Sequence, residues 1–362
     1  GNFLKTDSAS GKITLSGTLN SRPEERYAFD FNSGQNSTVS FVGGSAQAAT
    51  EGWNMVANPY PSQYDNSQTT REGSVSPAVY VWNGQSFESY NNGVGNARYI
   101  APFQAFFMQN FTPSQQALPS MVFRKAGRVT NQSTILTKKS NLDNVKIGIE
   151  KNGNSLDEVW IGFKHDAIED FDRYDAWKLL GNENAPFLYS KMGQNAFSIN
   201  RLNSDSTEHL VPLHFDYKNQ DGNTFTFEID ISELKSYQSL WVRDLKTGKY
   251  LDLTENTQFN FVHDESFFGP RFILYFARKT VNLVENIKND FYAYSSEGGL
   301  ELVFGSNQEN TKVYVYNSAG ALVCSKISNG KRIGFYGLKP GIYLLKVQSK
   351  EGNVFADKVI VE

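Results

Sequence analysis

The chain has 362 residues, a length typical of roughly two to three domains, and 35 Lys and Arg against 38 Asp and Glu leave a net charge of −3. This balance excludes a chain-wide basic footprint for nucleic acid, and an apolar fraction of 39% excludes disordered and collagen-like chains. No run reaches the roughly 18 apolar residues of a membrane span. The single cysteine, Cys324, excludes an intrachain disulfide and a multi-cysteine zinc site, so we interpret it as a small packed hydrophobe.

Short strands are predicted along the chain, because apolar and polar residues alternate with period two. The clearest alternation covers residues 12–16, 224–231 and 312–316. Turn dipeptides that end in Gly separate such runs, and they begin at Asn83, Asn92, Asn152, Asp221 and Asn329. Helix is expected as a minor component, with one capped turn over residues 232–236. The predicted fold class is all-β, as tandem antiparallel β-sandwich domains.

Two segments interrupt the strand pattern. Residues 130–141 are rich in Ser, Thr and Lys, and residues 278–290 follow the strongest apolar run without a clear sheet pattern. We interpret both segments as linkers. They divide the chain into an N-terminal β-sandwich domain over 1–132, a second β-sandwich domain over 138–279 and a C-terminal domain over 286–362.

Sequence motifs for catalysis are absent. The four histidines form neither His-x-x-x-His nor His-Glu-x-x-His, and they stand at His165, His209, His214 and His263. A spacing of five places His209 and His214 on opposite faces of a strand. Gly-x-Ser-x-Gly and the Walker loop do not occur, and residues 93–96 form only half of a dinucleotide fingerprint, which we interpret as a turn. We therefore predict no enzyme activity, cofactor or metal site, and keep a pair of loop carboxylates for glycoside hydrolysis as an alternative.

The densest group of carboxylates consists of Asp166, Glu169, Asp170, Asp172 and Asp175. Calcium takes about six to eight oxygen ligands, which such a stretch could supply. Against this, Lys164, Arg173 and Lys178 interleave with the acids, and the glycine-centred EF-hand loop is missing. We interpret the stretch as solvated charges on a hairpin or short helix, with calcium binding as the alternative.

Aromatic residues cluster in the first third, at Trp53, Tyr60, Tyr64, Trp82, Phe87 and Tyr90. Such rings either pack inside a sandwich or stack on a sugar from an exposed position. We favour packing and assign no ligand-binding residue. If a ligand site exists, the loops 58–64 and 91–96 are the first places to look, because loops on a rigid sheet carry function.

Several segments resemble recurrent parts of large secreted and surface proteins of the Bacteroidota. In the first third these are residues 52–62 (GWNMVANPYPS), the aromatic strand 78–83 and the proline-led strand 100–107. The middle third resembles the module that usually follows these segments in such proteins. The matching segments are residues 166–178, 241–244 and 271–276.

The last third is similar to the C-terminal sorting domain of type IX secretion cargo, a small Ig-like sandwich. The matching segments are residues 313–320, 338–347 and 358–362. That family opens the domain with a Pro-Asn-Pro strand, whose place is taken here by Phe291-Tyr292-Ala293-Tyr294. Asp7-Ser8-Ala9 also fits the short acceptor pattern that resembles Bacteroidota protein O-glycosylation.

The resemblance implies a location outside the cell or on the outer-membrane surface, with residues 286–362 contacting secretion or attachment machinery. The chain begins at Gly1 without Met, which we interpret as processing that removed a leader. We predict a non-enzymatic adhesion or binding scaffold whose partner is a host or bacterial surface glycan or protein, with no nucleic acid. The alternative is a carbohydrate-binding accessory region of a larger secreted glycan-degrading enzyme.

Overall fold

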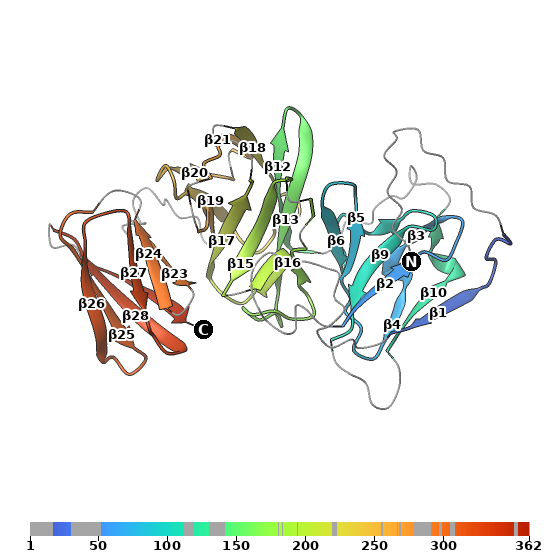
Figure 1. Cartoon of the computed structure of the whole chain (residues 1–362), viewed down its shortest axis with the longest axis horizontal. Coiled ribbons are helices and arrows are strands. Elements are labelled where there is room, and N and C mark those ends of the chain that lie inside the picture. Colours follow the sequence, from blue (N-terminus) through green and yellow to red (C-terminus); the bar gives the residue numbers. More distant parts are fainter. Residues whose placement is uncertain are drawn as a thin grey trace.

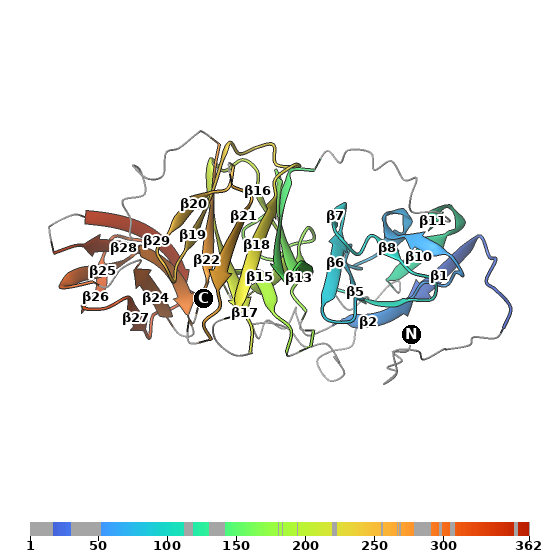
Figure 2. The same cartoon turned by 90° about the horizontal axis from the view of Figure 1, so that it is seen from above.

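The computed structural model describes residues 17–29, 52–111, 119–129, 142–179, 181–182, 184–193, 195–218, 223–254, 256–265, 267, 269–278, 291–296, 299–304, 308–350 and 354–361. We call residues 17–129 the N-terminal unit, 142–278 the middle unit and 291–361 the C-terminal unit. They follow one another along the long axis of the molecule (Figures 1 and 2). The described residues contain strands and two short 3₁₀ helices but no α-helix, which confirms the all-β fold class.

Some sequence features lie outside the described residues. These are the strand at 12–16, Asp7-Ser8-Ala9, the Asp221-Gly222 turn and the linker segments 130–141 and 279–290. The domain boundaries at 132, 138, 279 and 286 fall in the same segments and stay predictions. Within the described part of the chain, no helix is long and apolar enough to cross a membrane.

The N-terminal unit packs three antiparallel sheets around one core. Its elements are β1 (Glu24–Ala28), β2 (Trp53–Ala57), β3 (Gln63–Asp65), η1 (Asn66–Gln68), β4 (Thr70–Glu72), β5 (Val79–Trp82), β6 (Phe87–Asn91), β7 (Val94–Gly95), β8 (Tyr99–Ile100), β9 (Ala105–Gln109), β10 (Ser120–Arg124), η2 (Lys125–Gly127) and β11 (Arg128–Val129). The strand orders are β2-β9-β5-β6-β7, β1-β10-β4 and β11-β3-β8. Phe106 from the five-stranded sheet and Phe123 from β10 are both fully buried in the core between the layers.

The middle unit is one continuous sheet that folds over a single core. Its strands are β12 (Asn144–Lys151), β13 (Asn154–Lys164), β14 (Ala176–Trp177), β15 (Phe187–Met192), β16 (Asn195–Asn203), β17 (Glu208–Asp216), β18 (Thr224–Asp230), β19 (Ser239–Asp244), β20 (Tyr250–Asp252), β21 (Gln258–Val262) and β22 (Phe272–Ala277). Their order is β20-β19-β22-β17-β15-β16-β13-β12-β18-β21, and β14 pairs with β16. Rings meet across the fold, for example Phe272 of β22 and Phe227 of β18, whose centroids lie 4.9 Å apart.

One strand pair departs from the predicted antiparallel pattern. β13 and β16 run parallel, with Gly162 opposite Arg201 and Lys164 opposite Asn203. A parallel pair needs a long crossover connection, which the chain between these strands supplies. That crossover includes the acidic stretch and β14, so the parallel pair brings the stretch against β16 and not to a hairpin tip.

The turn dipeptides behave as predicted at some positions and differently at another. Asn152 and Gly153 have φ values of 54° and 76° and join β12 to β13 as a two-residue hairpin. Asn329-Gly330 follows β26 (Leu322–Ser328) and precedes β27 (Arg332–Tyr336), which belong to different sheets, so this turn connects two layers. The capped helical turn at 232–236 is a single turn in which the Leu234 N–H donates to the Ile231 carbonyl, with no helix.

The C-terminal unit is a two-sheet sandwich. Its remaining strands are β23 (Phe291–Ser296), β24 (Gly299–Phe304), β25 (Thr311–Asn317), β28 (Gly341–Gln348) and β29 (Val354–Val361). The sheet β23-β24-β27 faces the sheet β26-β25-β28-β29. Leu302, Val313 and Leu345 from the two sheets share its core, where strands with alternating burial point every second side chain inward.

We expect the core of the middle unit to depend on Phe272, which is fully buried beside Phe227 and Phe261. Phe272→Ala removes this ring and leaves a cavity, so it should lower the free energy of unfolding by about 3–5 kcal/mol. Leu210→Ala, at a side chain that is 49% exposed on the neighbouring strand, should change it by less than about 0.5 kcal/mol. Denaturant unfolding of both variants measures the difference, and equal losses would contradict this assignment of the core.

Candidate functional site

The N-terminal and middle units share a buried apolar junction. Trp53, Tyr80 and Phe107, on the five-stranded sheet, pack against Trp177 and Phe197 of the middle unit. Trp177 is 3% exposed, and its ring stacks on Phe171 with centroids 3.8 Å apart and planes 5° from parallel. A contact of this area and depth resembles the inside of a domain, so the two units form one block.

Hydrogen bonds from both units satisfy the polar groups buried in this junction. The Trp177 backbone N–H donates to the Tyr80 hydroxyl oxygen at 2.9 Å, and its indole N–H donates to the Gln109 side-chain oxygen at 3.0 Å. The hydroxyl oxygens of Ser89 and Ser198 lie 2.9 Å apart. A buried polar group without a partner costs about 1–3 kcal/mol, so these pairs fix the relative position of the two sheets.

The turn after β6 extends the junction to the acidic stretch. The Asn91 amide donates to the Asp175 carbonyl at 2.8 Å and to the Arg173 carbonyl at 3.1 Å. In return, the guanidinium of Arg201 donates to the backbone carbonyls of Asn91 and Asn92, at 3.3 Å and 3.2 Å. The loop 91–96 therefore serves as an interface between the units.

The acidic stretch holds its own backbone in place. Asp172 accepts from the N–H groups of Ile168 and Tyr174, and Asp175 accepts from those of Asp172 and Arg201 at 2.8 Å and 2.7 Å. Asp175 is 1% exposed, which corrects the interpretation of the whole stretch as solvated charges: its carboxylate faces β16 because the crossover packs there. Burial raises the pKa of Asp175 well above its usual value.

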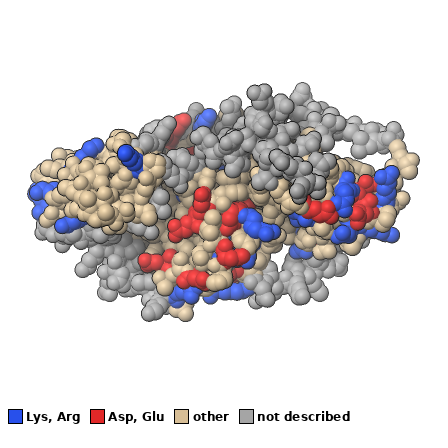
Figure 3. Space-filling model, turned by 90° about the horizontal axis from the view of Figure 1, so that it is seen from below, with Lys and Arg blue, Asp and Glu red and all other residues tan. Residues whose placement is uncertain are grey.

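The described residues contain no group of three or more His, Cys, Asp and Glu side chains that could hold a metal ion. Asp166, Asp170 and Asp172 instead contact lysine, asparagine or backbone donors within the loop. Figure 3 shows acidic side chains gathered over the middle part of one face of the molecule, beside basic ones. Calcium binding by residues 166–175 gains no support from this arrangement.

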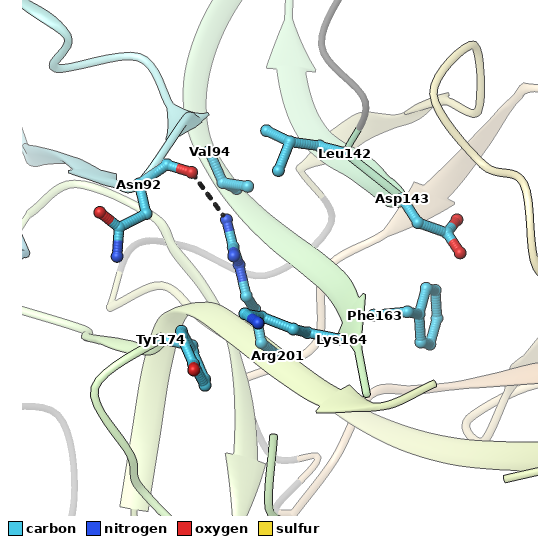
Figure 4. A pocket seen from close by; sticks show the side chains of 8 residues that line it. All are labelled: Asn92, Val94, Leu142, Asp143, Phe163, Lys164, Tyr174 and Arg201. Carbon is cyan, nitrogen blue, oxygen red and sulfur yellow. Dashed lines mark hydrogen bonds between the residues drawn. The ribbon is translucent and has the colours of Figure 1, made fainter. Parts of the chain in front are cut away.

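A cavity of about 380 Å³ opens beside the junction (Figure 4). Both units contribute to its lining, which comprises Asn92, Val94, Leu142, Asp143, Phe163, Lys164, Tyr174 and Arg201. Lys164 and Arg201 come from the parallel strands β13 and β16, while Asn92 and Val94 come from the turn after β6 and from β7. Val94, Leu142 and Phe163 supply apolar walls, so the cavity combines apolar surface with several polar groups, as ligand pockets do.

Arg201 is buried at the cavity wall with one nitrogen unsatisfied. Its side chain is 4% exposed, and its Nε atom has no hydrogen-bond partner among the described residues. Gly162 makes room for it, because a Cβ atom there would lie 3.0 Å from the Arg201 Cγ atom. Sequence reasoning missed Arg201, and the signal that could have found this place was a glycine inside a long strand, which often marks a close approach.

Two groups that line the cavity, the Lys164 ammonium and the Tyr174 ring, contact each other, and both contact the Asp166 carboxylate. The Lys164 Nζ lies 2.6 Å from an Asp166 carboxylate oxygen and 4.5 Å from the centroid of the Tyr174 ring, whose hydroxyl donates to the same carboxylate. The hydrogen bond from Lys164 holds the pKa of Asp166 at about 2. The carboxylate in the cavity lining, Asp143, accepts from the backbone N–H groups of Lys235 and Ser236. The arrangement offers donors and ring faces to a ligand.

The aromatic set named from the sequence divides into buried and half-buried side chains. Trp53, Tyr60, Tyr64 and Tyr90 are at most 8% exposed, so they cannot stack on a sugar in this fold. The loop 58–64 is fixed from inside: the Asn58 amide donates to the carbonyls of Ser62, Ile100 and Ala101, and the Tyr60 hydroxyl donates to the Phe123 carbonyl. Trp82 and Phe87 keep partial exposure and lie 5.1 Å apart.

The four histidines are separated in the fold. His165 is exposed beside Asp205, and His263 is buried. His209 packs against Phe163 and Tyr237 on the core side of β17, while His214 stacks on Tyr189 from the other side, as the spacing of five predicts. Cys324 is half-buried in β26, where burial raises the pKa of its thiol.

Comparison with known proteins yields one informative match. A family model described as the secretion system C-terminal sorting domain matches residues 296–362. No curated protein sequence matches the chain.

Solved structures similar to this chain include PorZ, described as an essential bacterial surface component of the type IX secretion system of Porphyromonas gingivalis, at 14% identity, a TM-score of 0.19 and coverage of 25% of this chain and 14% of that one. CopC from Methylosinus trichosporium OB3b has 22% identity, a TM-score of 0.15 and coverages of 19% and 79%. The adhesin domain of Epf from Streptococcus pyogenes has 10% identity, a TM-score of 0.17 and coverages of 60% and 92%. Structural similarity this low carries no argument about function.

We predict that the junction makes the N-terminal and middle units unfold together. Trp177→Ala removes the stacked ring and the indole hydrogen bond to Gln109, so it should cost about 3–5 kcal/mol and split the calorimetric transition that the two units share into two. Trp241→Ala, on β19 away from the junction, serves as the matched control and should leave the number of transitions unchanged. A single transition in Trp177→Ala would contradict the shared junction.

Stability should fall as the pH drops below about 6.5, partly because of His209. Burial lowers the pKa of this imidazole, whose Nε2–H donates to the Asn203 carbonyl at 2.8 Å. Below about pH 6.5 the unfolded chain therefore binds a proton at His209 more readily than the folded chain does. The contribution of His209 to the free energy of unfolding is present above the pKa of the unfolded state and is lost as the pH falls below it.

His209→Phe keeps a ring beside Phe163 and Tyr237 but cannot titrate, so its unfolding free energy should decline less steeply from pH 7.5 to pH 5. His165→Asn is the contrasting variant, because the hydrogen bond to Asp205 raises the pKa of this exposed histidine. Urea unfolding of both variants and the unchanged chain between pH 7.5 and pH 5 measures how the unfolding free energy depends on pH. The same pH dependence for the His209 variant and the unchanged chain would refute the role of His209.

Proposed function

The chain ends in a C-terminal sorting domain of the type IX secretion system, and from this premise we propose that it acts as a non-enzymatic binding scaffold outside the cell. The sorting domain implies a Bacteroidota origin and export to the cell surface or the extracellular space. Its partners in that process are parts of the secretion machinery. The remaining two units then present a surface to a glycan or protein outside the cell.

The cavity between the N-terminal and middle units is the observation on which the binding role rests. Polar residues from both units line it, with Asn92 on one side and the donors Lys164 and Arg201 on the other, and Arg201 donates to the Asn92 carbonyl. Pockets at domain interfaces that combine apolar walls with a few polar groups are the usual form of a ligand site. The rigid junction supports this role, because a site shared by two units keeps its geometry only when the units are fixed to each other.

The ligand chemistry follows from the donors. An ammonium group, a buried guanidinium and an amide favour a ligand with carboxylate or hydroxyl oxygens, and the Tyr174 ring adds an aromatic surface. A surface glycan with acidic sugars or an acidic protein segment has these groups. The carboxylate in the cavity lining, Asp143, accepts from two backbone N–H groups, and Asp166 accepts from the lining residues Lys164 and Tyr174.

The second candidate is a carbohydrate-binding accessory region of a larger glycan-degrading enzyme. The half-buried pair Trp82 and Phe87 favours it, because partly exposed rings on a sheet can stack against a sugar. This candidate places sugar binding on β5 and β6, whereas the first places the ligand in the cavity.

Binding of the full chain to bacterial and host cell surfaces and to an array of acidic and neutral glycans tests the proposal. We expect binding that Lys164→Gln weakens about tenfold, which corresponds to about 1.4 kcal/mol. Lys164 has a partly exposed side chain, so this variant should fold normally. Lys246→Gln, which also removes a partly exposed, ion-paired lysine, is the matched control and should bind like the unchanged chain.

Four outcomes would oppose the proposal. Absence of binding to every surface and glycan removes the scaffold role, and equal binding by the Lys164 variant moves the ligand away from the cavity. If Trp82→Ala abolishes sugar binding while Lys164→Gln does not, the accessory-region candidate takes its place. Turnover of chromogenic glycosides by the full chain, lost on removal of a carboxylate, would contradict a non-enzymatic role.

A further inference from the structure

Lys178 and Asp157 form a charged pair inside the core of the middle unit. Their side chains are 1% and 3% exposed, and the Lys178 Nζ lies 2.5 Å from an Asp157 carboxylate oxygen. Asp157 alternates with Val159 and Ile161 on the inward face of β13, and Lys178 directly follows Trp177 of the junction. Lysine and aspartate are almost never this deeply buried unless they are paired.

The hydrogen bonding around Lys178 does not suit an ammonium ion. An ammonium group has three donors, but among the described residues Asp157 is the one acceptor within reach of the Lys178 Nζ. Two N–H groups would then be buried without partners, which disfavours the ammonium form of the side chain in the folded chain. The nitrogen of a secondary amide, in contrast, has only one N–H, so the site suits an amide bond between the two side chains better than an ammonium.

We propose that Lys178 and Asp157 condense into an intramolecular amide bond that covalently links β13 to the junction segment. The reaction consumes no external reagent: the Lys178 Nζ bonds to the Asp157 carboxyl carbon, and one carboxyl oxygen leaves as water. The established properties of the chain do not include this modification, and its basis is independent of the ligand cavity.

The surroundings favour each step of the condensation. In the first step of the condensation, a proton passes from the ammonium to the carboxylate across their 2.5 Å contact and leaves an amine beside a carboxylic acid. Burial raises the pKa of the Asp157 carboxyl, although Lys178 acts against this. The amine lone pair then attacks the carboxyl carbon, and the folded chain holds the two groups at a high effective concentration.

The backbone supplies a donor for the transition state. The Leu188 N–H lies 2.7 Å from the same Asp157 oxygen, where it stabilises the negative charge that develops as the C–N bond forms. The C–O bond to the other oxygen then breaks, and the departing hydroxyl takes the proton that the nitrogen releases. Lys178 is held for this attack by its own backbone N–H, which donates to the Ala196 carbonyl at 2.8 Å.

The bond would enclose the acidic stretch in a covalent loop. Residues 158–177 lie between its ends and include Arg173, Asp175 and Trp177, which make hydrogen bonds to the N-terminal unit. A cross-link that closes such a loop restricts the unfolded chain and so stabilises the folded one. The junction segment would then be tied to the middle unit by a bond that does not exchange with water.

Mass spectrometry of the full chain tests the proposal. The folded chain should be lighter than its sequence mass by one water molecule, about 18 Da. After trypsin, which cleaves after Lys and Arg, peptide 152–164 should remain joined to peptide 174–191, because a modified Lys178 blocks cleavage. Asp157→Asn should give the same joined product with release of ammonia.

The exposed pair Lys246 and Asp264 provides an internal control in the same digest. Its N···O distance is 2.6 Å, but both side chains are more than a quarter exposed, so water satisfies their charges and no bond should form. Lys178→Met should show the full mass of its sequence. If the unchanged chain has its full mass and yields peptides 152–164 and 174–178 separately, the pair is only an ion pair and the proposal is wrong, whether or not the variants fold.

Discussion

The close packing of Trp177 between two sheets is the constraint on which the arrangement of the molecule depends. The ring stacks on Phe171, and its centroid lies 5.8 Å from that of Phe197. The backbone N–H of Trp177 donates to Tyr80 and its indole N–H donates to Gln109, both in the N-terminal unit. Apolar burial supplies the favourable free energy, and the directional hydrogen bonds allow only one relative orientation of the units. The N-terminal and middle units therefore act as one body, with a ligand-sized cavity at the edge of their contact.

Two loops of the N-terminal unit are held by hydrogen bonds, one of them across the junction and the other within the unit itself. The turn after β6 is engaged by Arg201 and by the carbonyls of Arg173 and Asp175. The loop before β3 is held by Asn58 and Tyr60. Both loops place polar atoms against other parts of the protein, which fixes the conformation of each loop.

The contact between the middle and C-terminal units has a different character. The guanidinium of Arg332 lies 5.2 Å from the centroid of the Phe267 ring, and a Cβ atom at Gly269 would come within 3.0 Å of the Tyr294 hydroxyl. Single contacts of this kind contribute about 0.5–1 kcal/mol where they are exposed. The sorting domain keeps its own two-sheet core, which includes Leu302 and Val313. Its fold is thus built independently of the block that precedes it.

The sequence by itself determined the class of fold and the identity of the last unit. Alternation at residues 224–231 and 312–316 matches β18 and β25, and the Asn152-Gly153 pair makes the expected hairpin, because both signals depend on neighbours in the chain. The resemblance of residues 313–320 and 338–347 to a sorting domain is confirmed by the family match, since those strands carry a recognisable pattern.

Only the tertiary structure decided which polar residues would meet. Asp175 looked like one more solvated carboxylate, yet the parallel pairing of β13 and β16 buries it against Arg201. Asp157 and Lys178, twenty-one positions apart, gave no local signal of a shared core position. The local pattern specifies which face of the sheet a residue of a strand points to. Contacts between distant segments depend on how the sheet folds over its core. That folding is set by the summed burial of many side chains.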